Sequence, residues 1–325
     1  MKELTDSITS ILGKYPRVDL LKTPFLIHRL PRLSFHTGYN IYILRDDLTG
    51  FALGGNKTRK LVYLIGDALA KKADTLVTMK ASSFSRNAAA AGRVCGFDVH
   101  VVLDGEESDQ NPASQAFFKQ YDTQLHYVSK DKENALPNAY NHLVESLKKQ
   151  GKIVYELHPG GSDSIGALGY IDAFNQILHY SQCSGVHFHG IIHATGSTGT
   201  QAGLLLGQCI SGYDTHIIGV AVSQKAGVQS KRVHELALST AQMLGIQFDE
   251  TQIVVDDRFI GPGYAIPSEE GKNAVRMFAA MEGILLDHVY TGKAAAGLLY
   301  YAMNKMFEGD NVLFVHTGGN SDLFY

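Results

Sequence analysis

The sequence predicts an α/β fold in which mostly parallel strands alternate with helices. Short runs of β-branched and aliphatic residues, such as 75–79 and 190–194, have the length and composition of buried strands. Longer stretches, one of them the alanine-rich 87–94, have helical character and separate these runs. Strands that alternate with helices of this length form βαβ units, which build parallel sheets.

The elements follow in chain order from these patterns. A first helix should follow Gly54-Gly55, because apolar residues then repeat at helical spacing: Leu61, Leu64, Ile65, Ala68 and Leu69. Strands are expected at residues 75–79, 98–103, 125–128, 153–157, 190–194, 216–222 and 312–316. Further helices are expected at residues 87–94, 111–121, 134–149, 167–179, 227–244 and 269–282, and from Thr200 onward.

The chain of 325 residues exceeds one typical core, so two domains are expected. The Pro/Gly-rich loop at 158–162 is the best candidate boundary. It would separate a smaller inserted α/β domain, residues 60–157, from a larger domain made of residues 1–59 and 158–325.

Composition argues against several classes of function. A net charge of -3 gives no electrostatic reason to bind nucleic acid or an anionic membrane. No apolar run has membrane-spanning length, and residues 1–14 lack the pattern of a signal peptide. The three cysteines are far apart and odd in number, which indicates thiols in a reducing compartment, so we expect a cytoplasmic protein. No Cys/His cluster has metal-ligand spacing, so no metal is expected.

The segment Gly54-Gly55-Asn56-Lys57-Thr58-Arg59-Lys60 places a lysine at a Gly-Gly turn that opens a helix. Glycines allow the backbone to approach a ligand closely. Lys57 is therefore well placed for imine chemistry if the site is partly desolvated. The alternative is a basic helix N-terminus on the surface.

A second Gly/Ser/Thr-rich segment, residues 195–203, lies between an expected strand and an expected helix. Its small residues let backbone N–H groups converge at a helix N-terminus, where they can hold a phosphate: Gly196, Ser197, Thr198, Gly199 and Thr200. It lacks the Walker A lysine and the GxGxxG spacing. A flexible turn is the alternative. Together with a helix-start lysine, the loop suggests pyridoxal phosphate as the cofactor.

Several blocks resemble the 1-aminocyclopropane-1-carboxylate deaminase and D-cysteine desulfhydrase family: RDDLTGFAL at 45–53, GGNKTRK, TGSTGTQAG, DHVYTGK at 287–293 and HTGG at 316–319. The resemblance implies fold type II of the pyridoxal-phosphate enzymes, related to tryptophan synthase β. This fold has two open, twisted, mostly parallel sheets with flanking helices, usually in a homodimer. It also implies Lys57 as the Schiff-base lysine, Lys60 as a phosphate contact, and Tyr264 and Tyr290 as active-site tyrosines.

One block departs from the family pattern. Residues 79–87, Met-Lys-Ala-Ser-Ser-Phe-Ser-Arg-Asn, align only with two residues missing upstream. Ser82 then matches the family's catalytic serine, and Ser83 replaces an asparagine that contacts the cofactor ring hydroxyl. Phe84 replaces a polar residue. Lys80 stands where glycine is expected, either as a ligand for an anionic group or as a surface lysine displaced by the deletion.

The resemblance also implies the reaction. Family deaminases carry glutamate and leucine where this chain has Thr291 and Thr317, whereas desulfhydrases carry hydroxyl residues that face the cofactor ring. We therefore expect a D-cysteine desulfhydrase-like lyase that acts on a small amino acid and releases pyruvate, ammonia and sulfide. Lys57 would act as the base, and Tyr264 and Tyr290 would steer or protonate the departing group. The alternatives are the deaminase itself, and a cofactor-binding member with altered or lost turnover.

Overall fold

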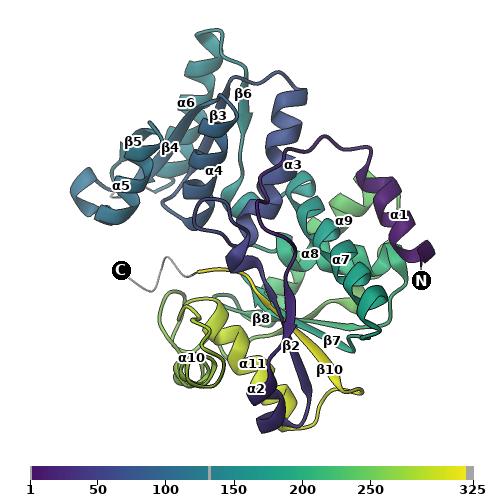
Figure 1. Cartoon of the computed structure of the whole chain (residues 1–325). Helices are drawn as coiled ribbons and strands as arrows, with labels where there is room; N and C mark the ends of the chain where they lie inside the picture. The colour runs from purple at the N-terminus through teal and green to yellow at the C-terminus, as the bar shows by residue number, and fades with distance from the viewer. Residues whose placement is uncertain (1, 131–132, 320–325) are drawn as a thin grey trace.

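The computed structural model describes residues 2–130 and 133–319, which form two sheets flanked by helices (Figure 1). The larger sheet has the strand order β1-β2-β10-β7-β8-β9, and the smaller one β5-β4-β3-β6. Only the pairing of β1 with β2 is antiparallel among these strands. The predicted α/β fold with two mostly parallel sheets is thus confirmed.

The larger sheet joins distant parts of the chain. Its strands are β1 (Ile27–Arg29), β2 (Asn40–Arg45), β7 (Gly190–Thr195), β8 (His216–Ala221), β9 (Val254–Asp256) and β10 (Asn311–His316). The last strand, β10, lies between β2 and β7. All six residues of β7 are buried, as expected of a parallel strand covered on both faces.

Helices cover both faces of this sheet (Figure 1). One group is α1 (Lys2–Leu12), α3 (Asn56–Ala70), α7 (Ser164–Ser184), α8 (Gly199–Ser211) and α9 (Ala226–Leu244). The other is α2 (Pro31–Thr37), α10 (Glu269–Glu282) and α11 (Thr291–Met303). Neighbouring residues of β7 point to opposite faces, so Ile191 packs in the core that contains Leu204 of α8. Ile192 packs with Ala294 of α11.

The smaller sheet is wholly parallel. It contains β3 (Thr75–Met79), β4 (Asp98–Asp104), β5 (Gln124–Val128) and β6 (Val154–Glu156), with α4 (Ser83–Val94), α5 (Pro112–Gln120) and α6 (Ala135–Lys149) around it. Short 3₁₀ turns lie at Asp46–Leu48, Glu107–Asp109, Pro159–Gly161 and Glu250–Gln252. Because α3 packs against both α4 and α7, it lies between the two sheets. The division into domains at residues 60 and 157 stays a prediction.

Sequence patterns missed some elements. The omitted ones are α1, β1, α2, β2, β9 and α11. Strands β1 and β9 have only three residues each, and α11 is apolar on nearly all sides, which removes the amphipathic period. Helix α4 begins at Ser83, four residues before the expected start, because Ser82 caps it. Within the residues that the structure describes, no helix combines the length and apolarity needed to cross a membrane.

Candidate active site

A cavity of about 440 Å³ opens where strands of both sheets end. Met79 ends β3 and Thr195 ends β7, while Val222 and Thr317 directly follow β8 and β10, and all four line the cavity. Ligands of open parallel sheets bind at this carboxyl edge. Most predicted site residues line it: Lys57, Ser82, Ser83, Gly196, Ser197, Thr198, Thr200, Tyr264, Tyr290 and Thr317. Lys60, Gly199 and Thr291 are buried and are not among its lining residues.

Lys57 lies in the first turn of α3, as predicted. Gly54 and Gly55 have φ of 70° and 92°, and a Cβ on Gly54 would lie 2.2 Å from the carbonyl oxygen of Asp47. The turn therefore requires glycine. The backbone N–H of Asn56 donates to the carbonyl of Thr317 at 2.9 Å, which joins the helix to the end of β10. The Lys57 amine donates to Oδ1 of Asn56 at 3.1 Å.

Lys60 is completely buried behind the loop that follows β7. Its amine donates to the carbonyl of Gly160 at 3.0 Å, to Oγ of Ser162 at 3.3 Å and to Oγ of Ser197 at 3.5 Å. Burial holds the pKa of Lys60 well below its ordinary value, and the charge of Lys57 lowers this pKa further. Because these three acceptors are neutral, a bound anion would stabilise the charged amine.

The loop from Gly196 to Thr200 connects β7 to the N-terminus of α8. Thr198 has φ of 72°, a conformation that non-glycine residues rarely adopt. A Cβ on Gly199 would lie 2.9 Å from Nζ of Lys60. The side-chain amide of Asn56 donates to Oγ1 of Thr200 at 3.0 Å and so links this loop to the helix of Lys57. Backbone N–H groups at a helix start, beside a buried lysine, fit a phosphate group.

The two predicted tyrosines meet at the cavity. Their hydroxyl oxygens are 2.5 Å apart, although they lie 26 positions apart in sequence. Tyr264 is 56% exposed, whereas Tyr290 is half-buried just before α11. The buried amine of Lys293 donates to the carbonyl of Gly263 at 2.9 Å and to that of Val222 at 3.3 Å. Lys293 therefore fixes the backbone beside Tyr264, a role that the sequence did not indicate.

The unusual segment before α4 also reaches the cavity. The hydroxyl of Ser82 accepts the backbone N–H of Ser85 at 3.2 Å, while Oγ of Ser85 accepts the N–H of Ser82 at 2.9 Å. Ser82 is thus the first half of a capping box. Phe84 is 1% exposed and contributes an apolar edge to the cavity. The side-chain amide of Asn87 donates to the carbonyl of Gly54 at 3.0 Å and ties α4 to the turn that carries Lys57.

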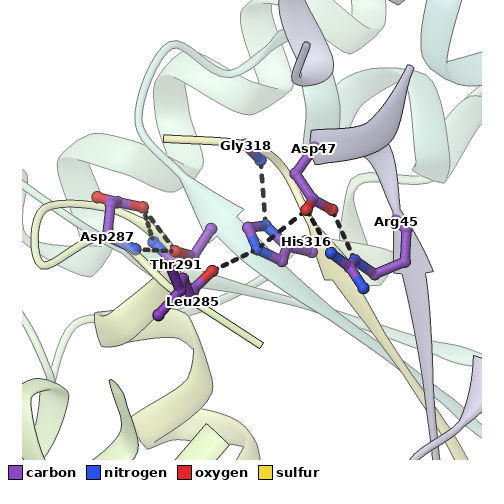
Figure 2. Close-up of polar contacts among 7 residues, drawn as sticks. All are labelled: Arg45, Asp47, Leu285, Asp287, Thr291, His316 and Gly318. Atoms are coloured by element: carbon purple, nitrogen blue, oxygen red, sulfur yellow. Dashed lines mark hydrogen bonds and ion pairs between the residues drawn. The ribbon is translucent and has the colours of Figure 1, made fainter. Parts of the chain in front are cut away.

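Thr291 and Thr317 differ in position, although the sequence assigned both to the cofactor ring. Thr317 lines the cavity, whereas Thr291 is fully buried and its hydroxyl donates to Oδ1 of Asp287 at 2.6 Å (Figure 2). Thr291 is not among the residues that line the cavity, and its ring contact stays a prediction.

His316 supports the wall behind Thr317. Figure 2 shows its ring between Leu285 and the Arg45–Asp47 pair. The N–H of Gly318 donates to Nδ1 of His316 at 3.3 Å, so the ring proton lies on Nε2, which donates to the carbonyl of Leu285 at 2.9 Å. Burial lowers the pKa of His316. The histidine is therefore a neutral support for the Thr317–Gly318 backbone.

Residues 18–318 match the model of a protein family described as "Pyridoxal-phosphate dependent enzyme". The chain belongs to this family. Its cofactor is pyridoxal phosphate, as the sequence predicted. Lys57, the loop from Gly196 to Thr200 and the buried Lys60 fit that cofactor, since together they offer an amine for its aldehyde and hydrogen-bond donors for its phosphate.

Relatives in this family cover nearly the whole chain. A D-cysteine desulfhydrase of Klebsiella pneumoniae (strain 342) is 38% identical over 325 residues, covering 96% of this chain and 97% of the relative. A Pyrococcus furiosus protein named "Putative 1-aminocyclopropane-1-carboxylate deaminase" is 37% identical over 320 residues, covering 98% of this chain and 96% of the relative.

Solved structures of other proteins have the same fold as this chain. The crystal structure of an ACC deaminase homologue superposes with a TM-score of 0.87 at 36% identity, over 96% of this chain and 94% of that one. A threonine deaminase isoform of Solanum lycopersicum has a TM-score of 0.71 at 18% identity, covering 99% of this chain and 87% of that one. At this identity the comparison shows the shared fold alone. The predicted resemblance and fold type II are confirmed.

Proposed function

We propose that this enzyme is a D-cysteine desulfhydrase-like lyase that eliminates the β-substituent of a small amino acid. The observation that carries the proposal is the convergence on one cavity of Lys57, the loop after β7 and the Tyr264–Tyr290 pair. When bound, pyridoxal phosphate acidifies the Cα–H bond of the amino acid by withdrawing electrons. The protein must then move two protons and hold the substrate.

Distinct residues serve these tasks. The amine of Lys57 removes the proton from Cα, because Lys57 lines the cavity from the first turn of α3. The paired hydroxyls of Tyr264 and Tyr290 donate a proton to the departing sulfur. The N-terminus of α4, which begins at Ser83, holds the α-carboxylate. D-cysteine and water thus become pyruvate, ammonia and hydrogen sulfide.

Thr317 supports elimination over ring opening. A hydroxyl stabilises a protonated pyridine nitrogen less than a carboxylate does, so negative charge on Cα is less delocalised. The alternative is the cyclopropane deaminase, which the name of the Pyrococcus furiosus relative favours. We further propose a cytoplasmic homodimer that binds no nucleic acid, supported by the family resemblance and the net charge of -3.

Product analysis tests the proposal. Purified holoenzyme should release pyruvate and sulfide from D-cysteine faster than from L-cysteine, and faster than 2-oxobutanoate from 1-aminocyclopropane-1-carboxylate. A preference for the cyclopropane substrate would reject the desulfhydrase assignment. Protein that carries the cofactor but converts neither substrate would favour a member with altered turnover.

A further inference from the structure

The cavity has a positively charged lining. Its cationic lining residues are Lys57, Lys80 and Arg232, and none of the described residues that line it is Asp, Glu or His. Lys60 adds a fourth basic side chain, whose amine donates to Gly160 and Ser197 of the lining. An unbalanced positive cavity attracts anionic ligands.

Two of these basic residues already have a place in the proposed reaction. Lys57 binds the cofactor, and Lys60 with the N-terminus of α8 faces its phosphate. The N-terminus of α4 provides backbone N–H groups for the α-carboxylate of the substrate. Lys80 and Arg232 remain, and they belong to different walls of the cavity, one next to α4 and one on α9.

Lys80 stands at a position where the backbone favours glycine. Its φ of 69° is costly for a residue with a Cβ, by roughly 1–2 kcal/mol. Two hydrogen bonds fix this conformation. The backbone N–H of Lys80 donates to the carbonyl of Val102 at 2.8 Å, and the hydroxyl of Ser85 donates to the carbonyl of Lys80 at 2.7 Å. Within residues 2–130 and 133–319, no carboxylate pairs with its amine. Strain of this kind at a cavity often serves function.

Arg232 is exposed on α9 and donates to neutral groups. Its Nη1 donates to the carbonyl of Gly196 at 3.3 Å and to Oε1 of Gln229 at 3.3 Å. Gln229 in turn donates to Oγ1 of Thr195 at 3.0 Å, which fixes this cluster to the end of β7. No carboxylate of the described residues pairs with the guanidinium. Its planar donors suit a carboxylate, sulfonate or similar oxyanion.

We propose that the preferred substrate is an amino acid whose side chain carries a second anionic group, bound by Lys80 and Arg232. The inference rests on the proposed function in that it uses the same cavity and cofactor. D-cysteine is then an accepted substrate that leaves these two cations without a partner.

Aspartate and asparagine test this directly, because they have nearly the same shape and differ by one charge. Each enantiomer of both is titrated into holoenzyme, and the change in cofactor absorbance gives Kd without turnover. Aspartate should bind about tenfold more tightly than asparagine, with a difference that shrinks in high salt. Lys80→Gln and Arg232→Gln should each reduce this ratio by about threefold or more. Lys231→Gln, an exposed neighbour with the same charge loss, should leave it unchanged.

Equal affinity for the two ligands overturns the inference. So does a fall in cofactor affinity in Lys80→Gln and Arg232→Gln with an unchanged aspartate preference, which would assign the cations to the phosphate. If Lys80→Gln weakened the binding of aspartate and asparagine equally, Lys80 would be assigned to the α-carboxylate, and this result would also overturn the inference. Turnover of D-cysteine without an aspartate preference rejects only this inference. An aspartate preference without D-cysteine turnover rejects only the proposed substrate.

Discussion

The hydroxyl of Thr291 and the carboxylate of Asp287 form a buried hydrogen bond of 2.6 Å (Figure 2). The backbone N–H of Asp287 donates back to the same hydroxyl at 2.9 Å. The other oxygen of Asp287 accepts the N–H groups of Val289 and Tyr290, both at 2.7 Å. This carboxylate therefore positions Tyr290 at the cavity, and Thr291 is part of its support.

Thr291→Glu should destabilise the protein. The new carboxylate would be buried beside Asp287, and both hydrogen bonds of the threonine hydroxyl would be lost. A buried, unpaired charge costs roughly 3–5 kcal/mol, so the free energy of unfolding in denaturant should fall by about that amount. Thr291→Ser keeps the hydroxyl and should lose less than about 1.5 kcal/mol. A glutamate variant as stable as wild type would mean that residue 291 faces the cavity after all.

Lys57→Ala should remove the visible absorbance of covalently held cofactor from purified protein. Its amine lies at the first turn of α3, beside Asn56, whose backbone N–H is bonded to the end of β10. Lys80→Ala is the matched control, since Lys80 also lines the cavity, and it should keep the absorbance. An unchanged spectrum in Lys57→Ala would move the attachment to another lysine, with Lys80 the first to examine.

Gly199→Val should weaken cofactor binding by orders of magnitude. The new Cβ would lie 2.9 Å from Nζ of Lys60 and 3.1 Å from Oγ of Ser162, so it would displace the groups around the phosphate. Each charge-assisted hydrogen bond lost costs about 1.5–3 kcal/mol. Equilibrium titration of apoprotein with pyridoxal phosphate measures the loss. Gly227→Val is the control, because nothing lies within 4 Å of a Cβ there. Unchanged affinity in Gly199→Val would exclude this loop from the phosphate site.

Stability should fall in mild acid because of His193. This residue of β7 is completely buried, and burial lowers its pKa to about 4. Its Nδ1 donates to the carbonyl of Ala194 at 3.0 Å, while Nε2 has no hydrogen-bond partner among the described residues. Between about pH 6.5 and 4 the unfolded chain binds this proton and the folded protein does not.

The free energy of unfolding should thus decrease as the pH falls through that window, by roughly 3 kcal/mol from His193. The lowered pKa of His316 acts in the same direction. Denaturant titrations at several pH values measure the slope, and His193→Leu should flatten it. A variant with the wild-type slope would assign the acid sensitivity to other groups.

Local patterns were sufficient to predict much of the fold and part of the site. The strand predicted at residues 75–79 matches β3, because a short apolar run between two helices is too short for a helix and is typical of a buried strand. The position of Lys57 at the start of a helix could be predicted because Gly54-Gly55 and the helical period that follows mark where α3 begins. The surroundings of Thr291 could not be predicted, because its hydroxyl bonds Asp287, which itself packs against Gly319, and no local pattern encodes these contacts. Arg232 and Lys293 were missed for the same reason, since helices α9 and α11 reach the cavity only through tertiary structure.

Lys293→Met should slow turnover while leaving the bound cofactor's spectrum intact. The buried amine holds the carbonyls of Gly263 and Val222 at 2.9 and 3.3 Å, and burial lowers its pKa. Methionine fills similar space without these bonds, so the backbone beside Tyr264 should shift. Misplacement of a proton donor by about 1 Å costs on the order of 100-fold in rate, so kcat should fall far more than KM changes. Lys272→Met, at an exposed ion pair with Glu269, is the control and should behave as wild type. A Lys293→Met enzyme with wild-type kcat would show that Tyr264 keeps its position without this amine.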